Sequence, residues 1–114
     1  MAKAATPVQH LVLFRFPVRL GAVEVAQMRQ QIAAWIGTID GLRRVRFGAD
    51  VSGRSLGHEL GLMIEFDGAE QLAAYLPHPL HQQFATWVAE RGGVVLAFDL
   101  PLTPDTVLLE PAGI

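Results

Sequence analysis

The chain has 114 residues, of which 51% are hydrophobic and 18% are charged, and its formal net charge is -2. This length fits one domain. The pI of about 6.0 argues against a nucleic-acid-binding protein, which needs clustered Lys and Arg. The chain contains no cysteine, which excludes disulfides and thiol chemistry. Because no stretch approaches the roughly 20 apolar residues of a membrane span, we expect a soluble cytoplasmic protein without a membrane partner.

The first half of the chain predicts two strands around one helix. Residues 8–16 carry apolar side chains on both faces, and Pro17, which has no N–H group, ends this strand. Residues 22–39 predict a helix, since apolar residues recur at steps of three and four, at Val25, Met28, Ile32, Trp35 and Ile39. Residues 42–51 predict a half-solvated strand, and the Gly- and Ser-rich residues 52–57 predict a hairpin loop.

The second half predicts two strands around a broken helix. Residues 59–67 alternate like a third strand, and residues 69–76 predict a short helix that a proline ends. A further helix is expected over residues 79–90 with His78 at its N-cap, because proline is favoured at a first helical position. Residues 94–100 predict the fourth strand.

The predicted order β-α-β-β-α-β is that of a ferredoxin-like α+β fold, in which a four-stranded antiparallel sheet carries its helices on one face. We assign residues 8–101 to this domain and residues 102–114 to a C-terminal tail. Residues 1–7 form an N-terminal segment that lacks the apolar run of a signal peptide. Within the proline-punctuated tail, residues 107–109 are the only candidate for regular structure.

The second face of the sheet predicts a homodimer. The helices are enough to cover only one face, yet residues 8–16 and 94–100 are apolar on both faces. Strands of this kind are buried on both sides. A second copy of the sheet is the simplest cover, since two-fold dimers are the commonest assembly. The alternative is an antiparallel sheet with one solvated face.

The side chains that offer chemistry gather between Tyr75 and Trp87. His81 shares a helical stripe with Phe84 and Val88, so it should face the core. An imidazole with an ordinary pKa of ~6.5 suits acid/base work, and Tyr75 offers a hydroxyl close by. The alternative interpretation is that His81 is a hydrogen-bonded core residue. Two histidines one turn apart are a weak metal signal, and we predict neither a metal nor a cofactor.

Four segments resemble the stress-responsive dimeric α/β-barrel family in their order and spacing. They are HLVLFRF at residues 10–16, FGADVS at 47–52, YLPHPLHQQF at 75–84 and FD at 98–99. By this resemblance, the region from about residue 8 to residue 100 is identified as a member of that family. The resemblance implies a dimer of ferredoxin-like subunits whose sheets pack into a barrel, with a pocket between helices and sheet in each subunit.

The resemblance also implies roles for four side chains. The family includes plant stress proteins without a firm enzymatic role and a polyketide cyclase that closes a ring by aldol chemistry. By similarity to the cyclase, His81 would be the catalytic base and Tyr75 the donor to the developing oxyanion. Asp99 would pair with His81 and fix its tautomer, which requires that Asp99 face the helices. His10 would be a further histidine of the pocket.

Several functions stay open at this point. The favoured one is a stress-type protein that binds a small apolar carbonyl compound, contacted by His10, Val12, Phe14, Phe84 and Trp87. One alternative is a cofactor-independent, cyclase-like lyase that acts through His81 and Tyr75. Another is a purely structural stress dimer. A cofactor-free oxygenase rests on analogy of fold alone.

Overall fold

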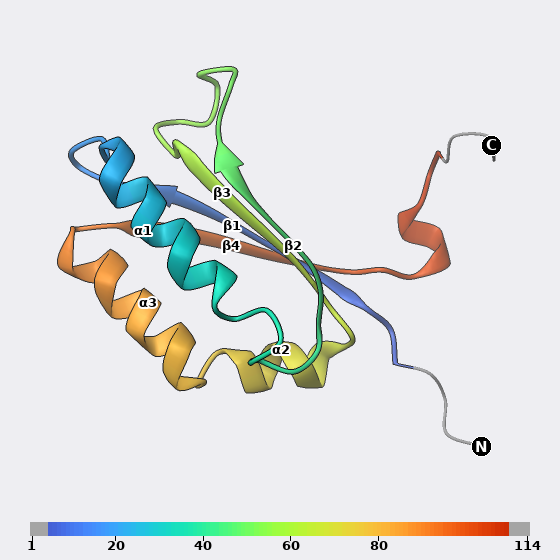
Figure 1. Ribbon diagram of the computed structural model, residues 1–114. Coiled ribbons are helices and arrows are strands. Elements are labelled where there is room, and N and C mark those ends of the chain that lie inside the picture. Colours follow the sequence, from blue (N-terminus) through green and yellow to red (C-terminus); the bar gives the residue numbers. More distant parts are fainter. Residues whose placement is uncertain (1–4, 110–114) are drawn as a thin grey trace.

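The computed structural model describes residues 5–109, which fold into a sheet with its helices on one side (Figure 1). The elements follow the predicted order, and two separate helices lie between the third and fourth strands, as expected. In chain order they are β1 (Val8–Arg15), α1 (Ala22–Ala33), β2 (Leu42–Ala49), β3 (Leu60–Phe66), α2 (Ala69–Tyr75), α3 (Pro79–Glu90) and β4 (Val94–Pro101).

The four strands form one antiparallel sheet in the order β2-β3-β1-β4. The helices α1 and α3 lie across the same face of this sheet, and α2 lies near one end of it (Figure 1). The predicted ferredoxin-like α+β fold is therefore confirmed. None of the helices within residues 5–109 is long and apolar enough to cross a membrane.

The first helix is shorter than the sequence predicts. It ends at Ala33, and the chain then turns repeatedly up to Ile39. The Trp35 N–H donates to the carbonyl of Ile32, three residues back, which tightens the last turn. Gly37 then adopts a left-handed backbone with φ of 81°. Trp35 and Ile39 are still buried, so the apolar spacing continues although the helix does not.

The helix α3 begins where the sequence predicts. His78 is the N-cap of α3, and its Nδ1 accepts a hydrogen bond of 3.1 Å from the Leu80 N–H. Pro79 occupies the first helical position, where its missing N–H costs nothing. This cap fixes the start of α3, and with it the direction in which His81 points.

The tail carries its short regular structure earlier than predicted. A 3-10 turn occupies Pro104–Thr106, where the Thr106 hydroxyl donates to the carbonyl of Thr103. Residues 107–109 have no regular structure, so that prediction was wrong. The tail is tied to the domain by the Leu102 N–H, which donates to the carbonyl of Pro7, and it then runs away from the sheet (Figure 1).

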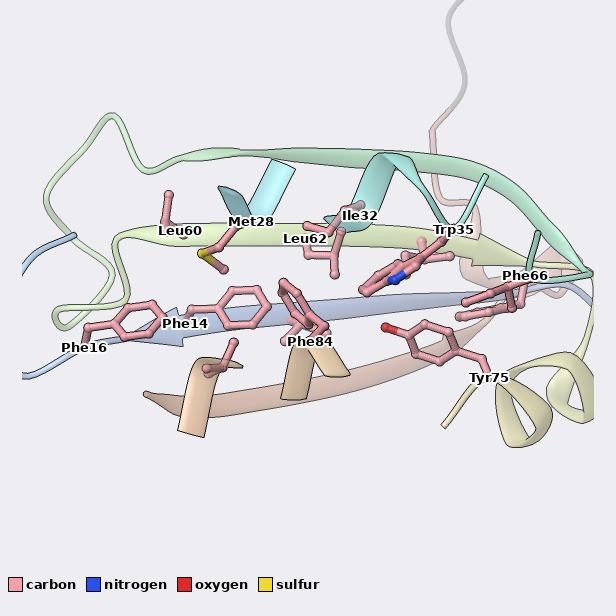
Figure 2. Packing of buried hydrophobic residues seen from close by; sticks show 14 residues of the cluster. Phe14, Phe16, Met28, Ile32, Trp35, Leu60, Leu62, Phe66, Tyr75 and Phe84 are labelled. Carbon is pink, nitrogen blue, oxygen red and sulfur yellow. The ribbon is translucent and has the colours of Figure 1, made fainter. Parts of the chain in front are cut away.

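Aromatic rings form the centre of the core between the sheet and the helices (Figure 2). The ring of Trp35 lies edge-on to Phe84 at 5.1 Å and to Tyr75 at 5.5 Å between centroids. Phe14 of β1 meets Phe84 at 5.8 Å. Edge-to-face pairs add about 0.5–1.5 kcal/mol each beyond the burial of area. These contacts join α2, α3 and the turn that follows α1 to the same face of the sheet.

The opposite face of the sheet is open and largely apolar in the single chain. Leu11 and Leu13 of β1 point to this face and are half-buried. Beside them, Met63, Leu96 and Phe98 are exposed. The apolar character that predicted burial on both sides is therefore present, and no element within residues 5–109 covers it.

Candidate functional site

A cavity of about 270 Å³ lies between α3 and the sheet. Most of its lining is apolar and comes from every strand except β2 and from the two later helices: Val12, Phe14, Leu62, Leu76, Phe84, Ala85, Val88, Ala89, Gly93, Val95 and Ala97. Three polar side chains complete it, namely His10, Tyr75 and His81. The cavity is thus an apolar space with a small number of hydrogen-bonding groups.

Two local patterns direct these side chains into the cavity: the alternation of buried and less buried residues along β1, and the apolar side of α3. On β1, His10, Val12 and Phe14 are buried and share the helix-facing side. On α3, His81 lies one turn before the buried Phe84 and lines the cavity with it. The prediction that His81 faces inward is therefore confirmed.

The tight turn from α3 into β4 closes one end of the cavity. At Gly93 an added Cβ atom would lie 2.5 Å from Cγ1 of Val88 and 2.8 Å from the ring of Phe16. Side chains do not tolerate such distances, so only glycine lets β4 start this close to the end of α3. Val95 and Ala97 of β4 then become a wall of the cavity.

His10 and Asp99 form a hydrogen-bonded pair at the polar end. They lie directly opposite each other in the β1–β4 register, and Nδ1 of His10 is 2.5 Å from Oδ1 of Asp99. The His10 residue is 5% exposed, whereas the Asp99 side chain is 43% exposed. Because a carboxylate only accepts, Nδ1 of His10 donates this hydrogen bond, and the neutral tautomer that the bond selects carries its lone pair on Nε2. The rings of Phe66 and Tyr75 meet the imidazole edge-on.

His81 is held in a matching tautomer by the backbone. Its Nδ1 lies 2.8 Å from the carbonyl of Leu76, which can only accept, so Nε2 again carries the lone pair. Burial lowers the pKa of His81 below its ordinary value of 6.5, and the Leu76 hydrogen bond opposes this shift. Repulsion from His10 and His78 lowers this pKa further. His81 is therefore mainly neutral near pH 7.

Tyr75 connects the two histidines. Tyr75 is 1% exposed. The centroid of its ring lies 4.3 Å from the ring centroid of His81 and 5.8 Å from that of His10. The hydroxyl points into the aromatic cluster, away from α2 (Figure 2). Burial raises the pKa of Tyr75, so the hydroxyl stays protonated and remains a hydrogen-bond donor at any ordinary pH.

The polar end of the cavity has no charged wall. Within the part of the chain that the structure describes, no Lys, Arg, Asp or Glu lines it. The same residues contain no group of three His, Asp or Glu side chains that could hold a metal ion. The arrangement can therefore exchange hydrogen bonds and protons with a bound molecule, through two imidazole Nε2 atoms and one phenol.

Comparison with known proteins identifies the family of the chain. The model of the stress responsive A/B barrel domain matches residues 8–102. The chain belongs to the stress-responsive α/β-barrel domain family. Two relatives agree with this result. The stress-response A/B barrel domain-containing protein HS1 of Arabidopsis thaliana is 28% identical, covering 75% of this chain and 81% of its own. An uncharacterized protein of Streptomyces coelicolor is 31% identical, covering 71% of this chain and 93% of its own.

Solved structures have the same α/β-barrel subunit fold. A hypothetical Arabidopsis thaliana protein superposes with a TM-score of 0.74 at 28% identity, covering 90% of this chain and 94% of its own. A ferredoxin-like protein of unknown function from Jannaschia sp., described as dimeric, gives 0.72 at 22% identity, covering 84% and 99%.

Two enzymes share the α/β-barrel fold at lower identity. A hydroxynitrile lyase from Passiflora edulis has a TM-score of 0.70 at 17% identity, covering 86% of this chain and 96% of its own. A cofactor-independent oxygenase from Streptomyces nogalater has 0.70 at 14% identity, covering 93% and 100%. At these identities the likeness concerns the fold alone.

The pairing of Asp99 with His81, implied by the family resemblance, is wrong for this α/β-barrel domain. The sheet register brings Asp99 to His10 instead, while Nδ1 of His81 is occupied by the carbonyl of Leu76. The condition that Asp99 face the helices is nevertheless met, since Val95 and Ala97, on the same face of β4, line the cavity.

The predicted ligand contact of Trp87 is also not found. Trp87 does not line the cavity, although His10, Val12, Phe14 and Phe84 do. It comes one residue before the inward Val88, so it points about 100° away around the helix. Its ring instead stacks under the guanidinium of Arg91, at 3.7 Å from ring centroid to Cζ.

Sequence reasoning did not single out the small residues of the cavity. Ala85 and Ala89 line the α3 side, and Gly93 and Ala97 line the side of β4. The signal in the sequence is a pair of alanines one turn apart, Ala85 and Ala89, on a helix that otherwise carries mostly larger residues. Their small size is what leaves the space open.

We predict that His81 titrates below 6.5, because burial disfavours its charged form. The measurement is an NMR titration of the histidine ring signals, with His81 assigned by the signal missing from the His81→Gln variant. The lowered pKa of His81 also makes the stability of the protein depend on pH. The unfolded state binds the proton more readily, so the free energy of unfolding should fall as the pH drops below 6.5.

In the His81→Gln variant this loss of stability on acidification should be smaller than in the wild type. A His81 signal that titrates at or above 6.5 would contradict the burial of its ring.

Proposed function

We propose that this protein binds a small, mostly apolar molecule in the cavity between α3 and the sheet. The observation that carries the proposal is the cavity of about 270 Å³ with apolar walls and three polar side chains, His10, Tyr75 and His81, whose rings lie close together. This size lies near the lower limit of small-molecule sites, which span about 300–1,000 Å³. The open space also argues against a purely structural role, which would favour a filled core.

The lining points to a neutral ligand with one polar end. Burying an anion without a cation is costly, and no charged side chain among residues 5–109 lines the cavity. Nε2 of His10 and Nε2 of His81 accept hydrogen bonds, whereas the hydroxyl of Tyr75 donates one. A hydroxyl group next to a carbonyl, or an enol, would satisfy donor and acceptors together.

A second candidate function is acid/base catalysis on a bound carbonyl compound, favoured by the His10–Asp99 pair. A buried imidazole whose Nδ1 donates to a carboxylate presents Nε2 as a base, and the carboxylate stabilises the imidazolium that forms. His81 has a backbone carbonyl in place of a carboxylate partner, and its lowered pKa makes it a weaker base than a free imidazole. Tyr75 would donate to the developing oxyanion. Two proteins of the same fold are enzymes, a hydroxynitrile lyase and an oxygenase that is described as cofactor-independent, which supports a test for catalysis without a cofactor.

We further propose that the protein acts as a homodimer whose subunits meet through the open sheet face. The exposed Met63, Leu96 and Phe98 support this, since contiguous apolar patches mark interaction sites. Solved proteins of the same fold that are described as dimeric also support it.

Ligand binding is tested by filling the cavity. Ala85→Phe places a ring beside His81 and should abolish binding, whereas Ala74→Phe changes an exposed alanine of α2 outside the cavity and should not. The measurement is the rise in melting temperature with a panel of small apolar ketones, enols and phenols. At about 100 times the dissociation constant, a ligand should stabilise the wild type by roughly 2.7 kcal/mol. Equal shifts in Ala85→Phe would place binding elsewhere.

The catalytic candidate is tested without knowledge of the product. A base that removes a proton α to a carbonyl will exchange it for deuterium in D2O, and NMR detects this for any ketone that binds. We expect His10→Gln to abolish the exchange and Asp99→Asn to slow it by about a hundredfold or more. His81→Gln should have the smaller effect. Undiminished exchange in Asp99→Asn would rule out the His10–Asp99 base.

A further inference from the structure

The open face of the sheet carries one protruding ring. Phe98 of β4 is 60% exposed, and its neighbour on the same face, Leu96, is 55% exposed. In the register, Phe98 lies beside Leu11, which in turn lies beside Met63. Exposure of this much apolar area to water is unfavourable, and apolar patches of this kind mark interaction sites. We call the protruding Phe98 ring the knob.

The same face carries a hollow on the other side of the patch. Gly48 of β2 and Gly61 of β3 lie directly opposite each other, so neither strand has a side chain on the open face at this point. A Cβ atom added at Gly48 would meet nothing within 4 Å. The hollow measures about 400 Å³. Its apolar wall includes Leu11, Leu13 and Met63, and the polar residues Arg46, Asp50, Ser55 and His58 line it as well.

We propose that in the homodimer Phe98 of each subunit enters the Gly48–Gly61 hollow of the other. This inference rests on the homodimer proposed above and specifies its geometry. Phe98 and the two glycines lie on opposite sides of strand β1, whose Leu11 and Leu13 line the near side of the hollow. A two-fold axis that lies between the two sheets and runs roughly along β1 would place β4 of each subunit over β2 and β3 of the other, which makes the interface self-complementary.

The apolar side of the hollow fits a phenylalanine ring from a second copy. The ring would lose its exposed area against Leu13 and Met63, and aromatic anchors in central pockets carry much of the energy of an interface. Arg46 at the rim would lay its apolar stem along the ring and its guanidinium over the ring face. Each subunit supplies one knob and one hollow, so the pairing closes at two subunits. An unrelated partner or a lipid surface would have no need of this match.

The absence of native cysteine allows a direct cross-linking test. The double variant Phe98→Cys, Gly61→Cys should form a disulfide-linked dimer on mild oxidation, seen on a non-reducing gel. Within one chain the two positions are separated by β1, roughly 10 Å across two strand spacings, which exceeds the ~4.4–6.8 Å that a disulfide spans between Cα atoms. Each single variant should remain uncross-linked, and Phe98→Cys, Gly48→Cys provides a second pair.

The same inference predicts the effect of filling the hollow. Gly48→Leu has open space in the single chain, so it should leave the fold intact and raise the dissociation constant of the dimer by about thirtyfold or more, as loss of an anchor does. Gly21→Leu, at another glycine with open space but at the start of α1, is the matched control and should leave dimerisation unchanged.

The outcomes separate the two proposals. If light scattering gives a dimer but neither cysteine pair cross-links, the homodimer stands and the knob-and-hollow contact is overturned. Cross-linking of Phe98→Cys alone would place Phe98 on the two-fold axis and also overturn it. A wild-type monomer would overturn both the homodimer and this contact.

Discussion

The antiparallel pairing of β1 with β4 is the constraint on which the site depends. It sets His10 opposite Asp99 and Phe14 opposite Val95, and so fixes both the polar and the apolar end of the cavity. A slip of one residue would turn every side chain of β4 to the other face. Phe98 would then point at the helices, and Asp99 would leave His10. The tight turn at the end of α3, which only glycine permits, holds this register where β4 begins.

The cavity combines apolar walls with polar groups that are each fixed in one role. Asp99 fixes the tautomer of His10, and the carbonyl of Leu76 fixes that of His81, so both rings present an acceptor. Burial keeps Tyr75 a donor. A site of this kind costs little to maintain without a ligand, since no uncompensated charge is buried in it. It selects ligands by shape and hydrogen bonding, which suits one binding scaffold to several chemistries.

Periodicity and turn residues were enough to predict most of the fold. The apolar spacing of α3 was enough to predict that His81 faces inward, and Pro79 was enough to predict the N-cap at His78, because both signals are local in the sequence. The end of α1 was missed because Trp35 stays in the core after the helix has stopped. The partner of Asp99 was missed because it depends on the pairing of strands far apart in the chain, and no local pattern encodes that register.

A crystal structure under xenon pressure would show directly whether an open apolar cavity lies between α3 and β4. Xenon enters apolar cavities that stay dry and needs no knowledge of the natural ligand. We expect a xenon atom among Phe14, Val88 and Val95, with His10 still hydrogen-bonded to Asp99. A filled core without xenon at this place would contradict the ligand-binding account.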